Sequence, residues 1–206
     1  YLWPDSQSYE TPIGGLTAVP MPDGSKVTLN TDSRIRIAVT DTERRIELRQ
    51  GEAFFEVARD PSRPFVVEAG SKRVIAVGTK FSVRREAGDV RVVVTEGAVR
   101  IEDTVLPAGS IARADEGGVA VQTRRLAEVE EQLSWRAGML VFRDRTLADA
   151  IAEFNRYNAR RFVIEDAEIG DLLIGGSFRA TNVDEFAELL EKGYPVRVKR
   201  EGDRLV

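Results

Sequence analysis

Five short apolar runs point to the fold of this chain: PDGSKVTLN (22–30), GEAFFEV (51–57), RPFVV (63–67), GTKFSV (78–83) and TEGAVRI (95–101). Turn residues punctuate the runs, and within them apolar and polar side chains alternate, as Val27 and Leu29 do with their neighbours. A period of two is typical of strands with one buried face. Turns about every 8–12 residues indicate a sandwich or a barrel. We therefore expect residues 12–122 to form one antiparallel, two-sheet, all-β domain.

An internal repeat comes next along the chain, made of residues 139–166 and 174–201. Thr146 and Thr181 each open a Thr-x-x-Asp sequence, in which the hydroxyl caps a helix and the Asp in the first turn favours the helix dipole. Apolar residues then recur on one helical face in both copies. Gly193 is placed to end the second helix.

Each predicted helix has a strand before it, ending at Phe142 or Phe178, and a strand after it, at residues 162–164 or 196–198. The repeat therefore predicts a strand-helix-strand (βαβ) unit used twice. We expect residues 135–206 to form a small α+β domain with its helices packed on a sheet.

The composition excludes several classes of function. The formal net charge is −4, and the chain contains neither histidine nor cysteine. An acidic chain has no basic field to hold phosphates, so we expect no nucleic-acid partner. Catalytic Ser-His-Asp or Cys-His groups and zinc sites with nitrogen and sulfur ligands are excluded, and we expect no metal and no organic cofactor. No apolar stretch approaches the roughly 20 residues of a membrane span, and the chain begins at Tyr1, which indicates a soluble fragment.

At this point the motifs match a known family. The periplasmic domain of FecR-type anti-sigma regulators resembles this chain in five segments that occur in the same order, namely MPDGSKVTLN (21–30), RIELRQGEAFFEVARDPSRPFVV (45–67), VGTKFSV (77–83), VVVTEGAVRI (92–101) and LPAG (106–109). The segment WRAGMLVFRDRTLADAIAEFNRY (135–157) resembles the region C-terminal to that domain in the family, and the terminal repeat is similar to the STN domain, a small signalling fold. The residues that carry the family signature are Asp23, Gly24, Ser25, Gly51, Glu52, Phe55, Pro64, Phe65, Gly78, Thr79, Phe81, Glu96, Gly97 and Trp135.

The resemblance implies a signalling role in the periplasm of a Gram-negative bacterium. Such a protein is a single-pass inner-membrane anti-sigma factor, whose cytoplasmic domain holds an extracytoplasmic-function sigma factor. Its periplasmic region binds the signalling domain of an outer-membrane TonB-dependent receptor, usually a siderophore importer, in cell-surface signalling. We expect the cytoplasmic domain and the membrane helix to lie outside this chain. The resemblance implies no enzyme, and iron would enter only as the cargo of the receptor.

The expected fold is therefore α+β overall. An N-terminal all-β two-sheet domain is followed by a small STN-like domain. The expected segments are a tail after the membrane helix (1–11), the FecR-like all-β domain (12–122), a helical connector (123–134) and the STN-like α+β domain (135–206).

The first candidate site is an exposed sheet edge in the terminal repeat. A small sheet has unpaired edge strands, whose backbone groups a strand of another protein can complete. We expect this edge around Leu172, Leu173, Ile174, Gly175 and Gly176, and we expect Pro or Asp at Ile174 to abolish receptor binding. An ordinary core strand explains the same residues equally well.

The second candidate site is the dipeptide Gly78-Thr79. The resemblance implies a possible cut at this bond, because some members of the family are cut at a Gly-Thr bond of this motif by attack of the threonine hydroxyl on the preceding carbonyl. Such self-cleavage needs only a hydroxyl and a strained bond. The alternative is a turn that enters the buried strand containing Phe81 and Val83.

Two other functions compete with the signalling role. A sugar- or cell-wall-binding periplasmic module would use exposed aromatic residues, and Trp3 and Trp135 are the candidates. We expect Trp135 at a domain junction instead. A hydrolase would use the carboxylates of Glu52 and Glu56, but their parity in the strand predicts that both are solvated. Asp23-Gly24 between two strands predicts a hairpin turn rather than a ligand loop.

Overall fold

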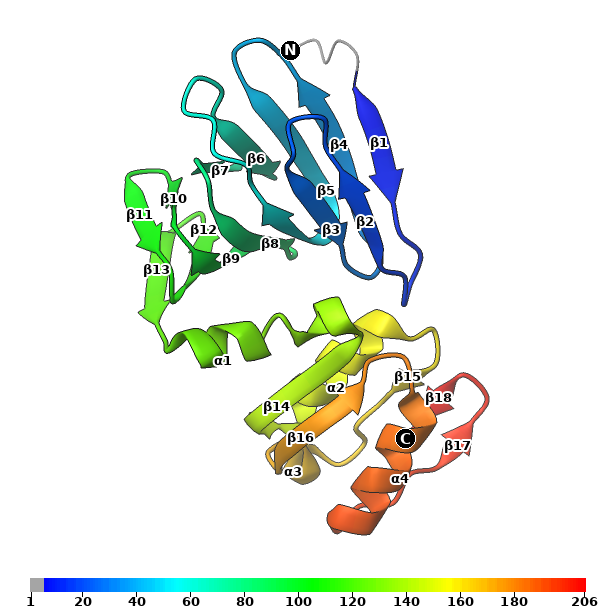
Figure 1. The fold of residues 1–206 in the computed structure, drawn as a ribbon. Helices are drawn as coiled ribbons and strands as arrows, with labels where there is room; N and C mark the ends of the chain where they lie inside the picture. Colours follow the sequence, from blue (N-terminus) through cyan, green and yellow to red (C-terminus); the bar gives the residue numbers. More distant parts are fainter. Residues whose placement is uncertain (1–5) are drawn as a thin grey trace. The chain divides into compact units, whose positions relative to one another are not determined.

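The computed structural model of the protein describes residues 6–206, which form two compact units (Figure 1). The first unit comprises the chain up to Pro12 and Leu16–Leu133, and the second comprises Ile13–Gly15 and Ser134–Val206. The first unit is built of strands with one short helix, and the second mixes helices and strands. The protein is mostly β and α+β overall.

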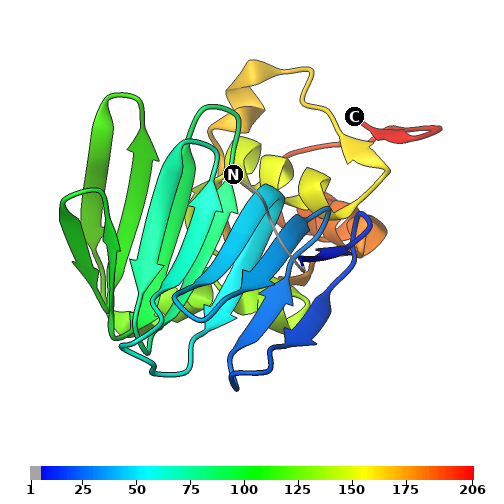
Figure 2. The same cartoon turned by 90° about the horizontal axis from the view of Figure 1, so that it is seen from above.

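Within the described residues the first unit has two sheets that share strand β5. One sheet has the order β1 (Gln7–Glu10), β4 (Arg34–Val39), β5 (Arg44–Glu56), β6 (Phe65–Ala69), β7 (Lys72–Ala76), β10 (Ala98–Ile101) and β11 (Thr104–Pro107). The other has the order β2 (Thr17–Pro20), β3 (Lys26–Leu29), β5, β8 (Lys80–Arg85), β9 (Val90–Glu96), β12 (Ser110–Asp115) and β13 (Gly118–Thr123). Figure 2 shows the N-terminal strands (blue) at one end of this unit and the strands from β10 onward (green) at the other.

The expected two-sheet domain is present, with two differences in detail. All neighbouring strands are antiparallel except β5 and β6, which are parallel because residues 57–64 carry the chain back to the start of β5. The expected tail at residues 1–11 is, in its described part, strand β1, which pairs with β4. Polar residues on an edge strand have no apolar pattern, so β1 left no signal in the sequence.

Gly51 lets β5 serve both sheets. The first half of β5 pairs with β4 and β6, and the second half pairs with β3 and β8. Gly51 lies between the halves with φ +81°, and a Cβ atom there would lie 2.2 Å from Oγ of Ser33 and 2.7 Å from the carbonyl oxygen of Asp32. Only glycine fits this backbone conformation and this close approach.

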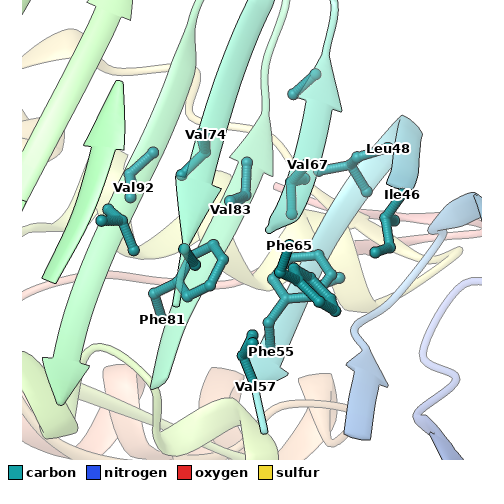
Figure 3. Packing of buried hydrophobic residues seen from close by; sticks show 14 of the residues in the cluster. Ile46, Leu48, Phe55, Val57, Phe65, Val67, Val74, Phe81, Val83 and Val92 are labelled. Atoms are coloured by element: carbon teal, nitrogen blue, oxygen red, sulfur yellow. The ribbon is translucent and has the colours of Figure 1, made fainter. Parts of the chain in front are cut away.

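The core of the first unit lies between the two sheets (Figure 3). It contains the inward-facing residues of both, and three aromatic rings form its centre. The ring centroids of Phe55 and Phe81 lie 5.1 Å apart, and those of Phe55 and Phe65 lie 5.7 Å apart. These three signature phenylalanines are therefore packing residues, and their burial stabilises the contact between the sheets.

The short helix α1 (Leu126–Glu131) follows β13 and belongs to the first unit. It packs against β9, with Val129 and Leu133 buried. The expected helical connector at residues 123–134 thus contains one helix of six residues.

The second unit repeats a strand-helix order. Its elements are the 3-10 helix η1 (Ser134–Ala137), β14 (Met139–Thr146), α2 (Leu147–Tyr157), β15 (Arg161–Phe162), α3 (Ala167–Gly170), β16 (Leu173–Arg179), α4 (Val183–Gly193), β17 (Arg200–Glu201) and β18 (Arg204–Leu205). Strands β14 and β16 form a two-stranded antiparallel sheet, and β15, β18 and β17 form a three-stranded sheet in that order. Each long helix follows a strand of the first of these sheets and precedes a strand of the second, so the strands before and after it are not neighbours in one sheet. The strand expected at residues 196–198 is wrong, because the strands after α4 lie at 200–201 and 204–205.

The two long helices begin with side-chain caps. Oγ1 of Thr146 accepts a hydrogen bond from the N–H of Asp149 at 3.2 Å, as predicted. The cap predicted at Thr181 is wrong by one residue. Asn182 caps α4 instead, and its Oδ1 accepts from the N–H of Glu185 at 3.2 Å. Asparagine is the better capping residue of the two, which explains the shift. Helix α4 ends at Gly193, as predicted.

The core of the second unit is a cluster of five phenylalanines. The rings of Phe154 on α2 and Phe186 on α4 stack with their centroids 4.0 Å apart. The other three rings pack around this pair and come from β14, β15 and β16, namely Phe142, Phe162 and Phe178. Both copies of the repeat therefore contribute to one core.

Candidate functional site

The Gly78-Thr79 dipeptide lies in the turn that enters β8. Gly78 has φ +64°, and a Cβ atom there would lie 3.0 Å from Cβ of Arg59. Thr79 is 2% exposed, and its hydroxyl oxygen has no hydrogen-bond partner among residues 6–206. Its carbonyl oxygen accepts from the N–H of Val57 at 2.9 Å. The Gly78-Thr79 bond thus lies beside the segment of residues 57–64. The Thr79 hydroxyl next to it is buried and makes no hydrogen bond within the described residues.

Gly97 packs against the same bond from the other side. A Cβ atom at Gly97 would lie 2.9 Å from Cγ2 of Thr79 and 3.0 Å from the carbonyl oxygen of Gly78. Glu96, next to it, pairs with Lys80 at 2.7 Å, and the hydrogen bond from Lys80 to this carboxylate raises the pKa of Lys80. The signature residues Glu96 and Gly97 therefore hold the chain on both sides of Thr79.

A buried ion pair fixes the segment of residues 57–64. Arg44 is 0% exposed, and its Nη1 lies 2.6 Å from Oδ2 of Asp23. The same guanidinium donates to the carbonyl oxygens of Ala58 at 2.8 Å and Arg63 at 2.9 Å. Ser25 completes the contact, because its Oγ accepts from the N–H of Ala58 at 3.0 Å.

The electrostatics of this pair favour the ionised carboxylate. Burial by itself would raise the pKa of Asp23, but the hydrogen bonds from Arg44 and Ser25 outweigh it, and the pKa lies below its ordinary value. In the same segment, hydrogen bonds from Ser62 and Arg63 lower the pKa of Asp60 to about 2. Both carboxylates therefore stay charged at neutral pH.

These contacts join several signature residues into one structure around Gly78-Thr79. Asp23 and Ser25 hold Arg44 and Ala58, and Val57, one residue earlier, hydrogen-bonds to Thr79. Sequence reasoning missed Arg44, because it lies in an arginine-rich stretch and nothing in the sequence distinguishes it from the other arginines nearby. The only signal was the signature Asp23, which needs a cationic partner once it is buried.

Glu52 corrects one expectation. The strand parity predicted a solvated carboxylate, which is wrong, because Glu52 is 6% exposed. It accepts hydrogen bonds from Nδ2 of Asn30 at 2.9 Å and from Oγ of Ser82 at 3.1 Å. The face of the sheet that carries it also buries Phe54, which is 1% exposed. Glu52 thus ties β5 to β8 and to the end of β3.

Glu52 and Glu56 do not form the pair of carboxylates that a hydrolase would use. Glu56 pairs with Lys26 at 3.3 Å at the surface, whereas Glu52 has the buried amide and hydroxyl partners described above. Among residues 6–206, no group of three or more acidic, histidine or cysteine residues is placed to hold a metal ion.

The remaining signature residues have structural positions. Gly24 has φ +84° in the turn between β2 and β3, which confirms the hairpin expected at Asp23-Gly24. The carbonyl oxygen of Pro64 accepts from the N–H of Arg44 at 3.0 Å. Trp135 lies in η1 and is 3% exposed, so its ring offers no face to a sugar. Trp3 lies outside the described residues.

The sheet edge expected in the repeat is strand β16. Of its two edges, one pairs with β14, and no strand among residues 6–206 pairs with the other. Leu173 is 58% exposed, and Gly175 and Gly176 are exposed, whereas Ile174 is fully buried. Leu172 precedes the strand, and its carbonyl oxygen accepts from the N–H of Leu147 at 2.7 Å. The expected stretch is thus both an edge and, at Ile174, a core residue.

The direction of the β16 backbone identifies the groups on its open edge. The N–H of Ala180 donates to the carbonyl oxygen of Gly138, on the β14 side. Because successive residues of a strand alternate, the N–H and C=O groups of Ser177 and Arg179 face away from β14. The N–H of Gly175 donates to the hydroxyl of Tyr194 at 3.4 Å, which fits the same alternation.

A small pocket lies between this part of β16 and α4. It has a volume of about 110 Å³. Its lining is half apolar, from Met139, Phe178, Phe186 and Leu189, and half polar, from Ser177, Arg179, Asn182 and Glu185. An open strand edge beside a small pocket suits a partner strand that pairs its backbone and places one side chain in the pocket.

No helix among the described residues is long and apolar enough to cross a membrane. No curated protein matches the chain significantly. Two crystal structures, each of a protein assigned as an anti-sigma factor from Parabacteroides distasonis ATCC 8503, are similar in fold. One has a TM-score of 0.80 and 23% sequence identity and covers 98% of this chain and 97% of the other. The second has a TM-score of 0.78 and 22% identity and covers 97% of each chain.

Two family profiles match the sequence in the order in which the two units occur. The profile described as FecR protein matches residues 7–100, which hold the Gly78-Thr79 turn and its surroundings. The profile described as FecR, C-terminal, matches residues 139–206, which hold β16 and α4. The two matches together cover most of the chain, so this protein belongs to the FecR family of anti-sigma regulators.

Proposed function

We propose that this chain is the periplasmic, signal-sensing region of an inner-membrane anti-sigma factor. In this proposal an extracytoplasmic-function sigma factor binds a cytoplasmic part of the same protein, and the periplasmic part binds the signalling domain of an outer-membrane TonB-dependent receptor for siderophores. The open edge of β16 carries the proposal, and membership of the FecR family supports it. The second unit would then act as an STN-like docking module.

The proposed contact is a strand of the receptor domain added to β16. Its backbone would pair with the outward N–H and C=O groups of Ser177 and Arg179. An apolar side chain of the same strand would enter the pocket beside Phe178 and Leu189. Leu189 is 43% exposed, so a partner that covers it gains hydrophobic burial.

The test must spare the core of the second unit. A substitution at Ile174 is unsuitable, because this side chain is fully buried and its loss would unfold the domain. Ser177→Pro removes one outward N–H group and leaves the hydrogen bonds to β14 in place. We expect calorimetry with the receptor signalling domain to show at least about tenfold weaker binding for Ser177→Pro and unchanged binding for the control Ser177→Ala. Equal affinity of a folded Ser177→Pro variant would refute the β16 contact.

We propose self-cleavage at Gly78-Thr79 as a second activity, supported by the buried hydroxyl of Thr79 that has no partner in the described residues. The hydroxyl oxygen would attack the carbonyl carbon of Gly78, and the peptide C–N bond would break as the hydroxyl proton moves to the departing nitrogen. Water would then hydrolyse the resulting ester. The products would be a carboxylate at Gly78 and a new amino terminus at Thr79.

Two variants separate the effect of the Thr79 hydroxyl on cleavage from the effect of the side-chain shape. Thr79→Ser keeps a nucleophile, whereas Thr79→Val keeps the volume and removes it. We expect two fragments on a denaturing gel for the natural chain and for Thr79→Ser, and one intact band for Thr79→Val. The fragments should stay together under native conditions, because β8 pairs with β5 across the cut. A single intact band in all three proteins would refute cleavage, and so would two bands in Thr79→Val.

A further inference from the structure

The two sheets of the first unit end in four edge strands, and one of them lacks the usual protection. Edge strands avoid uncontrolled pairing through proline, charge or short length. Strand β2 ends in Pro20, β11 ends in Pro107, and β1 has four residues that include Glu10. Strand β13 has six residues, Gly118–Thr123, with neither proline nor charge.

The outer edge of β13 presents unpaired backbone groups. The N–H of Arg124 donates to the carbonyl oxygen of Gly109, on the β12 side. The alternation of a strand then turns the N–H and C=O groups of Val119, Val121 and Thr123 away from β12. Among residues 6–206 no strand pairs with this edge, and Val121 is 43% exposed.

The charges beside β13 are arranged so that the strand complements itself. Glu116 lies in the turn that leads from β12 into it, and Arg124 follows it directly. Both residues are exposed. An antiparallel partner with the same sequence would place its basic end beside the acidic end of this strand, and its acidic end beside the basic end. A partner without this charge order would lack the match.

We propose that β13 is a self-association surface, on which a second copy of this chain pairs antiparallel. This interaction is separate from the proposed receptor contact at β16. The charges select the register in which Ala120 lies opposite the Ala120 of the second copy. Glu116, in the turn before β13, then lies beside Arg124 of the other copy at both ends. The backbone groups of Val119 and Val121 pair across the interface, and the sheet continues from one copy into the other.

Charge reversal tests both the antiparallel pairing of β13 and the claim that its partner is a second copy of this chain. In Glu116→Lys a lysine would face Arg124 at both ends of the dimer, and in Arg124→Glu a glutamate would face Glu116. We expect each variant alone to dimerise at least about tenfold more weakly than the natural chain in sedimentation velocity. An equimolar mixture of the two variants should regain the dimer, because every facing pair is then of opposite charge. Misfolding could not produce this rescue.

A crosslink tests the register. Ala120 is exposed, and in the proposed dimer it forms a non-hydrogen-bonded pair with its own copy, about 4.5 Å between Cα atoms. This spacing suits a disulfide, and the natural chain has no cysteine to interfere. We expect Ala120→Cys to form a covalent dimer under mild oxidation. The control Val105→Cys, on the edge strand β11 and 62% exposed, should stay largely monomeric.

Three results would overturn the proposal. A natural chain that remains monomeric at every concentration would show that β13 does not take a second copy. A mixture of Glu116→Lys and Arg124→Glu that does not recover the dimer would exclude the antiparallel charge match. Equal crosslinking of Ala120→Cys and Val105→Cys would exclude the register.

Discussion

Among single residues, the Asp23–Arg44 pair is the clearest case of a side chain that positions others. Both side chains are almost fully buried, and they hold residues 57–64, which in turn lie against Gly78-Thr79. Removing one member of such a pair leaves an uncompensated buried charge. The cost is then far larger than the net stabilisation that the intact pair provides.

We expect Asp23→Asn to lower the free energy of unfolding by about 3–5 kcal/mol, measured by urea denaturation at neutral pH. Asp60→Asn is the matched control, because Asp60 also bonds an arginine, Arg63, but at the surface, and its removal should change stability little. An equal loss in both variants would show that the burial of the Asp23–Arg44 pair is unimportant.

The same pair predicts a pH dependence. The pKa of Asp23 is lower in the folded protein than its ordinary value of 3.8, so the unfolded chain binds the proton more readily. The stabilisation is therefore complete above the unfolded pKa and is lost as the pH falls through the folded pKa. The natural chain should lose more stability than Asp23→Asn between about pH 6 and about pH 2. Parallel losses would be inconsistent with the lowered pKa.

Among the elements, β5 decides the architecture of the first unit, because it crosses from one sheet to the other at Gly51. We expect Gly51→Ala to lower the free energy of unfolding by more than about 2 kcal/mol, from the left-handed backbone and the close contact with Ser33 together. Gly24→Ala is the control, since Gly24 has φ +84° but nothing lies within 4 Å of its missing Cβ atom. Its cost should be about 1 kcal/mol. Equal costs would show that only the backbone conformation matters.

The elements also show which parts of the fold a local sequence pattern can predict. The alternating runs predicted the strands of the core, and the capping sequence predicted the start of α2, because these signals lie within a few residues. The two-residue strands β17 and β18 gave no period to detect. The parallel pairing of β5 with β6 was missed, since the choice of partner strand is settled by contacts far apart in the sequence.

Across the molecule as a whole, the sequence located the candidate sites better than it explained them. The motif around Gly78-Thr79 could be found in the sequence, but the buried network that surrounds it could not, because Arg44 and Gly97 meet it only through the fold. The edge at β16 was expected within one residue of its observed start, yet the burial of Ile174 depends on the phenylalanine core and was left open.

Hydrogen–deuterium exchange can establish whether a receptor signalling domain docks on β16. The natural chain would be compared alone and with the signalling domain of a TonB-dependent receptor from its own bacterium. The amides of Ser177 and Arg179 should exchange more slowly in the complex, whereas those of Phe178 and Ala180, which face β14, should change little. A complex that forms without protection at Ser177 and Arg179, or the failure of every such receptor domain to bind, would show that β16 is not the docking strand.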